Sequence, residues 1–434
     1  MKTAANSLDI LLTTWEGGGN VPPVLEAARR LLARGHRVRV MADAVVETDV
    51  AAVGVEFRPW SRAPNRRDRL PSSDVLRDWE AESDLAGFLR LHDRIMCGPA
   101  LAYAQDVQDE LAHHPADLIL TSEMLLGVMA AAEAAGVPFA LLCTNVSVFP
   151  IPGMPPMGMG LLPASNDAER ARHAEIAAGF RALLDEGLPA VNAARAALGL
   201  PAVRTLGDQF ETARRTLLAT SPAFDFPVEF LPPRFRYVGP LLAEPAWATC
   251  PSATPREMAE VPLVIVAFSS TYQNQLGALA NAARAMADLP VRGIITLGPA
   301  LAGSRIDAPA NVTVVDTASH EALMARAAVV ITHAGHGTVV RALAHGLPLL
   351  CLPMGRDQHD NAARVTARGA GLMLDRVASP EAIRAALVRL LHDVTFTDAA
   401  RRLCADIVRG AGTTDFVAEV EALAQARVPQ PTMS

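Results

Sequence analysis

The sequence has almost no lysine. Of its 434 residues, 39 are basic, and Lys2 is the only lysine among them, so the other 38 are arginine. A pyridoxal enzyme forms its Schiff base on a lysine, and a P-loop NTPase places a lysine after its glycines. The folded part of the chain therefore excludes both chemistries. The bias toward arginine, together with abundant Ala, Gly and Pro, is typical of GC-rich coding DNA and does not itself indicate a function.

Basic clusters, cysteine pairs and long apolar runs are also missing. The net charge is −7 and is spread along the chain, whereas nucleic acid or an anionic membrane requires concentrated positive charge. The five cysteines show no CxxC spacing, and Cys143 and Cys351, inside apolar runs, are expected in the core. The start has no signal-peptide pattern, and the longest apolar stretch, near Met124–Ala132, is far shorter than the roughly 20 residues of a membrane helix. We expect a soluble, cytoplasmic protein.

The composition favours an α/β protein with two domains. Half of the residues are apolar but only 5% are aromatic, so Ala, Leu and Val fill the core, as in helices packed on buried parallel strands. At this length, two domains of about 200 residues are expected. We assign residues 1–240 to the first domain and 263–412 to the second. The proline-rich, aperiodic stretch 241–262 joins them, and 413–434 form a C-terminal helix and tail.

The apolar pattern alternates between strands and helices. A strand (9–14), a glycine turn (17–19), a helix (24–33) and a strand (37–41) form a βαβ unit, which implies a parallel sheet. Further strands are predicted at 118–121, 139–143, 216–219, 263–268, 293–297, 312–315, 329–332 and 347–352. Further helices are predicted at 126–135, 167–198, 276–286, 338–344, 361–368 and 415–426. Two doubly wound, Rossmann-like domains of this kind would face one cleft at the carboxyl ends of both sheets.

Two stretches are predicted to be irregular. Residues 58–73, with clustered arginines, prolines and serines, indicate an exposed loop. Residues 144–163 contain too much Pro and Gly for a regular element.

A glycine-containing turn between a strand and a helix predicts a diphosphate site. The strand ends at Thr332 and the helix is expected to start near Thr338. Backbone N–H groups and the helix dipole at such a turn attract phosphate. Gly335 and Gly337 allow the backbone to approach the phosphate closely. The side chains of His333 and Thr338 can add hydrogen-bond donors.

Asp357 and Gln358 follow the next strand, beside that turn. A carboxylate and an amide together suit the vicinal hydroxyl groups of a sugar. The strings H-x-G-x-G-T (333–338), A-x-x-x-G-x-P and P-x-x-x-D-Q-x-x-N-A resemble the donor-sugar signature of family-1 glycosyltransferases with the GT-B fold. The segments W-x-G-G-G-N-V-x-P, P-x-P-G-x-P-P and SPAFDFP…RYVGP are similar to bacterial members that act on natural products. The resemblance covers nearly the whole chain.

The resemblance implies two Rossmann-like domains facing a cleft, with the acceptor bound by the first and a nucleotide-sugar by the second. The turn 269–271 is implied to approach the nucleotide, although Ser270 and Thr271 are equally explained as helix caps. The residues implied to hold the donor are Ser270, Thr271, His333, Gly335, Gly337, Thr338, Asp357 and Gln358.

The sequence departs from the family pattern at the catalytic dyad. The family usually has a histidine in the first glycine turn, where this chain has Asn20, whose amide cannot take a proton at neutral pH. The aspartate that commonly orients this histidine is replaced by Ser122, with Glu123 beside it. Either another group is the base, or the acceptor is acidic, such as a phenol or a carboxylate.

Four residues are candidates for a replacement base. Glu16 lies in the glycine turn, Glu123 follows Ser122, and His92 and Asp93 belong to a helical stretch whose apolar face could line an acceptor site. Each also has a structural interpretation. Glu16 could be a solvated turn residue, the Glu123 side chain could point away, and a lone helical histidine is more often packed than catalytic.

The sequence is compatible with either dTDP or UDP as the nucleotide of the donor. Where members that use ribonucleotides often have a glutamate for the ribose hydroxyl groups, this chain has Arg341, which mildly favours a deoxyribose. Thr317 stands near the position of the aromatic residue that often stacks on the base.

Other functions fit less well. Gly17 and Gly19 suggest a dinucleotide fingerprint, but Pro22 occupies the position of its third glycine. Several histidines near His333 lie on different elements, without an HExxH or D-x-D pattern, so we expect no metal. A catalytically impaired homologue that acts as a partner or regulator is the alternative, because the dyad is missing. A sugar epimerase would need acid/base groups at the sugar, which nothing singles out.

We therefore expect inverting, metal-independent transfer of a sugar from a dTDP- or UDP-sugar to a hydrophobic small molecule. The loop 144–163 is expected to line the acceptor site or to cap the sheet. No nucleic-acid or membrane partner is expected, and the only protein partner considered is a second copy, in a homodimer. Apolar loop residues suited to a bulky acceptor are Phe149, Met154, Met157, Met159 and Leu161.

Overall fold

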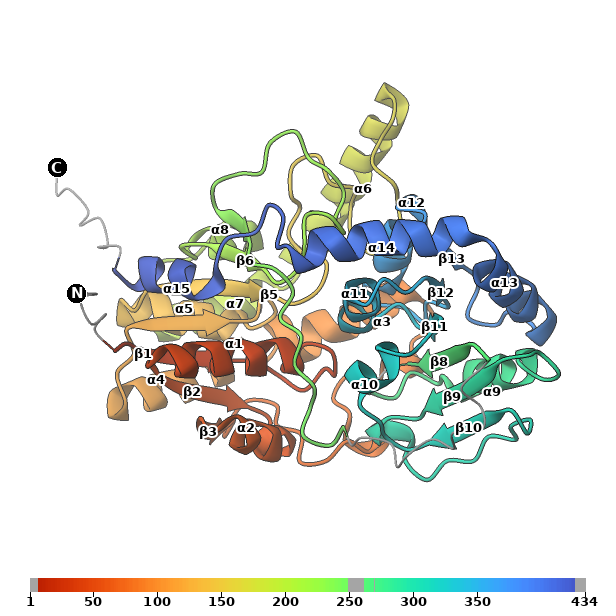
Figure 1. Cartoon of the computed structure of the whole chain (residues 1–434). Coiled ribbons are helices and arrows are strands. Elements are labelled where there is room, and N and C mark those ends of the chain that lie inside the picture. Colours follow the sequence, from red (N-terminus) through yellow and green to blue (C-terminus); the bar gives the residue numbers. More distant parts are fainter. Residues whose placement is uncertain (1–6, 249–260, 269, 426–434) are drawn as a thin grey trace, which may run out of the picture.

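The computed structural model describes residues 7–248, 261–268 and 270–425 and contains two parallel sheets flanked by helices (Figure 1). The first sheet has the order β3-β2-β1-β4-β5-β6-β7 and the second the order β10-β9-β8-β11-β12-β13. All neighbouring strands in both sheets pair in parallel. The GT-B type of architecture, two doubly wound α/β units, is thus confirmed.

The first sheet consists of β1 (Asp9–Thr13), β2 (Arg37–Ala42), β3 (Glu56–Pro59), β4 (Leu118–Thr121), β5 (Phe139–Cys143), β6 (Thr216–Leu218) and β7 (Phe235–Tyr237). Its helices are α1 (Val21–Arg34), α2 (Glu47–Val53), α3 (Asp84–Leu91), α4 (Ala100–His113), α5 (Leu126–Ala135), α6 (Asp167–Asp185), α7 (Leu188–Ala197) and α8 (Leu206–Glu211). Short helical turns lie at 44–46, 71–73 and 78–80, and a π-helical segment spans His92–Cys97.

The second sheet consists of β8 (Leu263–Ala267), β9 (Arg292–Thr296), β10 (Val312–Val315), β11 (Val329–Thr332), β12 (Leu349–Cys351) and β13 (Gly371–Met373). Its helices are α9 (Leu276–Ala285), α10 (His320–Met324), α11 (His336–Ala344), α12 (Gln358–Ala367), α13 (Pro380–His392) and α14 (Val394–Val408), with a short turn at 299–301. The last helix, α15 (Phe416–Gln425), returns to the first sheet, where Phe416, Val420 and Leu423 are buried near α1.

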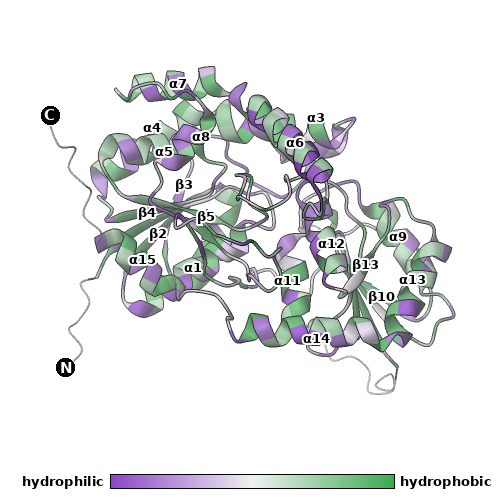
Figure 2. Cartoon of the chain, turned by 90° about the horizontal axis from the view of Figure 1, so that it is seen from above, coloured by the Kyte–Doolittle hydropathy of each residue, from purple (hydrophilic) through white to green (hydrophobic). Residues whose placement is uncertain are grey.

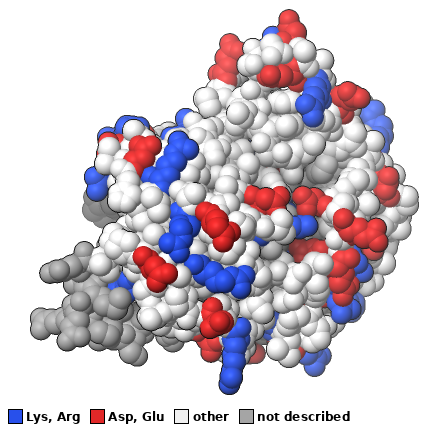
Figure 3. Space-filling model, turned by 90° about the vertical axis from the view of Figure 1, so that its right-hand side faces the viewer, with Lys and Arg blue, Asp and Glu red and all other residues white. Residues whose placement is uncertain are grey.

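The strands of both sheets are apolar, and helices cover both faces of each sheet. Every residue of β4, β5, β8, β9 and β11 is buried, as expected for strands covered on both faces. Figure 2 shows the hydrophobic residues concentrated in the strands of the first sheet, whereas α6 carries many hydrophilic residues. Leu184 is the one residue of α6 classed as buried. None of the described helices is long and apolar enough to cross a membrane. On the face shown in Figure 3, basic side chains lie among acidic ones.

Two stretches differ from the sequence prediction. The predicted helix 167–198 is broken into α6 and α7 because Pro189, in the first turn of α7, has no N–H group to donate to the carbonyl of Asp185, where α6 ends. Gly187 lies between the two helices and packs closely against the π-helical segment, where a Cβ would lie 2.3 Å from Cys97 Sγ. The predicted exposed loop 58–73 contains the end of β3 and buries Trp60. Its backbone is fixed because the Asp106 carboxylate accepts hydrogen bonds from the N–H groups of residues 61–63.

The predicted linker 241–262 is described only in part. Residues 249–260 lie outside the described residues, as do Lys2, Ser269 and Ala426. Residues 241–248 form no helix or strand, and Glu244 in this stretch accepts hydrogen bonds from Ser319 Oγ (2.6 Å) and Glu321 N (2.8 Å).

Candidate active site

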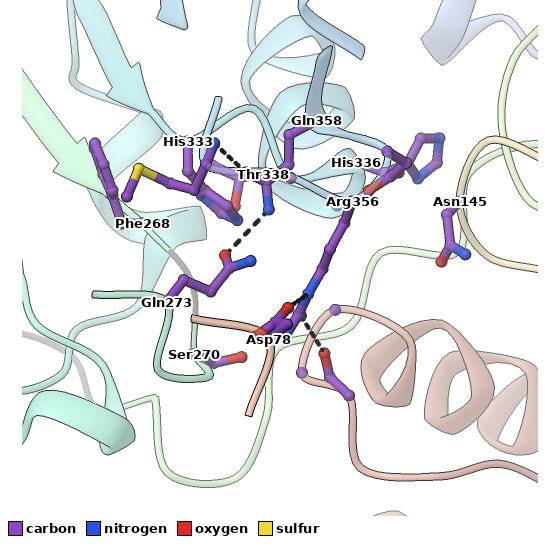
Figure 4. Close-up of a pocket in the computed structure, with 18 of the residues that line it drawn as sticks. Asp78, Asn145, Phe268, Ser270, Gln273, His333, His336, Thr338, Arg356 and Gln358 are labelled. Atoms are coloured by element: carbon purple, nitrogen blue, oxygen red, sulfur yellow. Dashed lines mark hydrogen bonds and ion pairs between the residues drawn. The ribbon is translucent and has the colours of Figure 1, made fainter. Parts of the chain in front are cut away.

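A cavity of about 1250 Å³ lies between the two sheets, at the carboxyl ends of their strands. From the first domain it is lined by residues that follow β1, β4 and β5, including Gly17–Asn20, Ser122 and Thr144. From the second domain it is lined by residues that follow β8, β11 and β12. This is the position where open α/β sheets bind ligands. Figure 4 shows part of its wall.

The turn between β11 and α11 forms one end of the cavity. α11 begins at His336, two residues earlier than predicted, with Gly335 as its N-cap residue. Its first N–H groups therefore come from the turn itself, which suits an anion. A Cβ on Gly337 would meet no atom within 4 Å, whereas a Cβ on Gly335 would lie 2.5 Å from His333 Nε2. The two glycines thus do different things: Gly335 makes room for the imidazole, and Gly337 leaves open space in the cavity.

His333 lines the cavity as an uncharged side chain. Burial lowers its pKa to about 3, helped by the positive charge of Arg356. At neutral pH it therefore carries one ring N–H group and no charge, and the ring is hydrogen-bonded to the backbone of Ala267. Thr338 lines the same end of the cavity.

Asp357 and Gln358 lie at the start of α12, which begins three residues earlier than predicted. Gln358 donates from Nε2 to Gln273 Oε1 (3.1 Å) and accepts from the backbone N–H of Met354 (2.7 Å). Asp357 Oδ2 accepts from Asn361 Nδ2 (2.9 Å) and its side chain is half-buried. Both side chains line the cavity. Gln273, which joins this region to the turn after β8, was not predicted from the sequence.

In the turn after β8, Ser270 lines the cavity and Thr271 does not. Ser269, predicted with them, lies outside the described residues. The alternative that Ser270 and Thr271 cap the following helix is wrong, because α9 starts at Leu276, well beyond them, and has Gln275 as its N-cap residue. A Cβ on Gly18 of the first domain, which has φ of 87°, would lie 2.8 Å from Ser270 Oγ. The two domains therefore touch closely here.

Of the five candidate catalytic residues, all in the described part of the chain, Asn20 alone lines the cavity. Its Oδ1 accepts from the backbone N–H of Gly17 (3.1 Å). Its Nδ2 donates to Thr14 Oγ1 (3.1 Å) and to the carbonyl of Trp15 (2.5 Å). The amide thus holds the glycine turn in shape and cannot accept the proton of an acceptor.

Glu16 is buried, not solvated. Its carboxylate accepts from the backbone N–H of Gly18 (2.9 Å) and pairs with Arg69 (3.1 Å). Burial raises its pKa, and the charges of Arg69 and Arg66 oppose this effect. Glu16 does not line the cavity, because these partners hold it behind the turn.

Glu123 is buried under the start of the loop 144–163. It accepts from the backbone N–H of Val148 (3.2 Å), from Ser147 Oγ (3.3 Å) and from Cys143 Sγ (3.4 Å). Burial raises its pKa to about 7. Its neighbour Ser122 lines the cavity, but Glu123 points the other way and does not.

His92 and Asp93 lie in the π-helical segment, away from the cavity lining. The imidazole of His92 is buried, with Nε2 2.9 Å from the carbonyl of Leu184 and 3.3 Å from Cys97 Sγ. Asp93 is exposed. The structural interpretation of a packed histidine therefore holds, since its ring is engaged with α6 and its own segment.

The first domain lines the cavity mainly with apolar side chains, among them Trp15, Leu76, Trp79, Phe88, Leu91, Phe180 and Leu183. Of the five apolar residues predicted in the loop 144–163, Met157 and Met159 line it as well. Phe149 packs in the core instead, and together with Met154 it lines a smaller neighbouring cavity of about 220 Å³. Leu161 lines neither cavity.

Arg356 crosses the cavity from one domain to the other. Its Nε donates to Asp78 Oδ2 (2.7 Å), and its Nη1 donates to the carbonyl of Gly17 (3.3 Å) and to Thr271 Oγ1 (3.2 Å). Beside it, Trp79 packs edge-on against Tyr272 with ring centroids 4.9 Å apart. The ion pair of Arg356 with Asp78 was not predicted from the sequence. Arg356 stands inside the P-x-x-x-D-Q string, but no pattern marked Asp78, which lies 278 positions away.

Arg341 lines the second-domain side of the cavity. Its guanidinium pairs with Glu321 (2.9 Å) and donates to the carbonyl of Ala243 (2.7 Å). Thr317 lies on the same wall. Among the residues that the structure describes, no three His, Cys, Asp or Glu side chains are grouped so that they could hold a metal ion.

Comparisons with known proteins agree with this geometry. Residues 285–423 match the family described as "Erythromycin biosynthesis protein CIII-like, C-terminal domain". The chain is 29% identical over 421 residues to 4'-demethylrebeccamycin synthase of Lentzea aerocolonigenes, covering 95% of this chain and 99% of that protein.

Two solved structures share the fold. The calicheamicin glycosyltransferase CalG4 is 21% identical with a TM-score of 0.72, covering 98% of this chain and 100% of that one. The glycosyltransferase VinC, in complex with DTDP, is 20% identical with a TM-score of 0.65, covering 95% and 98%. In view of the two parallel sheets, the cavity between them and these relatives, the chain is a glycosyltransferase of the natural-product biosynthesis type with the GT-B fold.

Proposed function

We propose that the protein transfers a sugar, with inversion, from a dTDP- or UDP-sugar to an apolar small-molecule natural product without a metal ion. The single observation that carries this proposal is the shared cavity. His333, Gly337 and Thr338 line its second-domain side, whereas aromatic and methionine side chains line its first-domain side. A polar anion site and an apolar site that open into one space suit a nucleotide-sugar and a hydrophobic acceptor.

The diphosphate would bind at the N-terminus of α11. The N–H groups of the turn and the helix dipole are the features that suit it, with the neutral His333 ring beside them. Asp357 and Gln358, at the start of α12, would hold hydroxyl groups of the sugar. With the sugar between these elements, its anomeric carbon would face the first domain.

Transfer would proceed by in-line displacement. The acidic acceptor gives its proton to solvent, its oxygen attacks the anomeric carbon from the first-domain side, the bond to the phosphate oxygen breaks, and the diphosphate leaves toward Gly335–Thr338. Rate enhancement would come from alignment of the two substrates and from stabilisation of charge on the leaving phosphate. Because the amide of Asn20 is no base, an acidic acceptor such as a phenol or carboxylate fits the site best.

Two observations bear on the nucleotide. Arg341, already paired with Glu321, offers no carboxylate to a ribose 2′-hydroxyl group, which favours dTDP. The related VinC structure is a complex with DTDP. Metal independence is proposed because the expected diphosphate donors are N–H groups and side-chain donors, with no carboxylate pair to bridge phosphate and cation.

A panel of dTDP- and UDP-sugars against phenolic and macrocyclic acceptors, read by mass spectrometry with EDTA present, tests the proposal. We expect a product with the mass of the acceptor plus one sugar residue, most readily with a dTDP donor and a phenol. Activity that disappears in EDTA and returns with Mg²⁺ would contradict the metal-independent mechanism.

The alternative is a catalytically impaired homologue that acts as a partner or regulator. The fully engaged amide of Asn20 at the position of the family's base favours it. Such a protein would yield neither product nor free nucleoside diphosphate in the same panel.

A further inference from the structure

The proposed diphosphate site needs a positive charge that the α11 turn does not supply. A nucleoside diphosphate leaving group carries several negative charges, and a neutral His333 provides none to balance them. The described chain contains no lysine. Among the described residues that line the cavity, four are arginines: Arg284, Arg341, Arg356 and Arg376.

Three of these arginines are turned toward other partners. Arg341 pairs with Glu321 and donates to a backbone carbonyl. Arg284 donates to Asn281 on its own helix, and Arg376 is exposed and donates to the carbonyl of Met354. Arg356 differs, because its side chain extends across the cavity and donates to Thr271 in the turn that also carries Ser270 (Figure 4). It is also the charge that contributes most to the low pKa of His333, as expected for the cation nearest to that imidazole.

The backbone around this arginine is held in an unusual conformation. Arg356 itself has φ of 58° and Gly355 has φ of 143°. On the opposite side of the cavity, Arg77, directly before Asp78, has φ of 48°. Non-glycine residues in the left-handed region cost free energy and persist where the surrounding structure enforces them, often at functional sites. Both partners of the Arg356–Asp78 ion pair are therefore presented by strained backbone.

Part of the Arg356 guanidinium is without a hydrogen-bond acceptor among the residues described. Nε and Nη1 serve Asp78, Gly17 and Thr271. Nη2 is buried, and within the described part of the chain it has no hydrogen-bond partner. The two N–H groups of Nη2 are therefore left for an anion, and the rigid guanidinium fixes their direction once Asp78 holds Nε.

We propose that Arg356 binds the diphosphate of the donor and stabilises its charge as it leaves, and that Asp78 is the positioning residue that holds Arg356 there. This inference rests on the proposed function and adds a residue to it. Asp78 and Gly17 belong to the first domain, whereas Arg356 belongs to the second. The cation is therefore in place when the two domains are together, which links stabilisation of the leaving group to the arrival of the acceptor domain.

The test compares binding of dTDP with binding of thymidine by calorimetry. R356Q is expected to weaken dTDP binding by roughly 10- to 100-fold, the range for a lost hydrogen bond to a charged group, while thymidine binding changes less than about twofold. D78N should weaken dTDP binding in the same selective way but by a smaller factor, and the double variant should be no worse than R356Q alone. R409Q, which breaks the exposed pair of Arg409 with Asp406, is the matched control and should bind both ligands as the wild type does.

Equal losses for dTDP and thymidine, or no loss for either, would overturn the proposal. If R356Q does not fold, R356K is measured in the same way. It keeps the charge but not the planar fork, and an unchanged dTDP-to-thymidine ratio would contradict the contact. Sugar transfer is assayed separately. If R356Q loses affinity for dTDP selectively but the wild-type protein transfers no sugar, the proposed function alone is wrong. If R356Q transfers sugar at the normal rate, this inference alone is wrong.

Discussion

Asp360 in α12 accepts a hydrogen bond of 2.5 Å from the backbone N–H of Gly158, in the loop that lines the first-domain side of the cavity. A second hydrogen bond, from Gly160, has a length of 2.8 Å. Asp360 stands two residues after Gln358 on the same helix. The element that would bind the donor sugar is thus tied directly to the loop that would bind the acceptor.

D360A should therefore loosen the loop without disturbing the diphosphate turn. Two backbone N–H groups lose their acceptor, which costs about 1 kcal/mol each, and Met157 and Met159 are held less firmly beside the acceptor. We expect the acceptor KM to rise several-fold while dTDP affinity, measured by calorimetry, stays within about twofold. D398A, at an exposed aspartate of α14, is the control. A parallel loss of dTDP affinity would show that Asp360 serves the donor instead.

G337A should stabilise the protein and weaken donor binding. Gly337 lies in the first turn of α11, where a Cβ meets open space, and alanine favours a helix by up to about 1 kcal/mol over glycine. The same methyl group would project into the space expected for the diphosphate. We expect a higher Tm together with at least about tenfold weaker dTDP binding.

G179A is the matched control for this change. Gly179 also lies in a helix, α6, with open space at its Cβ position, and it lines the same cavity from the first domain, away from the α11 turn. It should raise the Tm and leave dTDP binding unchanged. Unimpaired dTDP binding in G337A would contradict the placement of the diphosphate at the α11 turn.

E123Q should change how stability depends on pH. Folding raises the pKa of Glu123 from 4.5 to about 7, so between these values the folded protein binds more protons than the unfolded chain. Its contribution to the free energy of unfolding therefore falls as pH rises through this window, by a total on the order of 3 kcal/mol. Glutamine resembles the protonated form. In denaturant titrations, the free energy of unfolding of E123Q should rise relative to that of the wild type as the pH increases from 5 to 8. A difference between the two that stays constant with pH would contradict the burial of an acidic Glu123.

N20A should cost stability but not remove a base. The amide makes three hydrogen bonds in the glycine turn, and their loss is expected to destabilise the protein by about 1–3 kcal/mol. With a phenolic acceptor, kcat should remain within about tenfold of the wild-type value, which corresponds to an increase of at most about 1.4 kcal/mol in the activation free energy.

N192A provides the comparison for N20A. Asn192 makes two side-chain hydrogen bonds to the backbone of Val203, of 3.0 and 2.9 Å, away from the cavity. It should destabilise the protein to a similar extent with unchanged kinetics. Complete loss of turnover in a folded N20A protein would mean that Asn20 takes part in the chemistry.

The fold was largely predictable because most strands are continuous buried runs. The predicted bounds of β4, β5, β10 and β11 match the structure residue for residue. Other elements escaped detection. β7 and β13 have only three residues, and β3 (EFRP) is partly exposed and ends in proline, so their apolar signal is too short to stand out.

The cavity lining was predictable on the second-domain side and not on the first-domain side. His333, Gly335, Gly337 and Thr338 follow one another at a strand–helix turn, and local geometry alone brings them to the cavity. The candidate bases depended on side-chain direction, which distant partners decide. Arg69, 53 residues from Glu16, and Leu184, 92 residues from His92, turn these side chains away. No local pattern contains that information.

The anomeric configuration of the product tests the central claim most directly. The protein is incubated with dTDP-α-D-glucose and a phenolic acceptor, and the purified glycoside is examined by proton NMR. In-line attack from the first-domain side predicts the β-glucoside, recognised by its large coupling between the protons on the first and second carbons. An α-glucoside, or no glycoside although dTDP binds, would contradict the account.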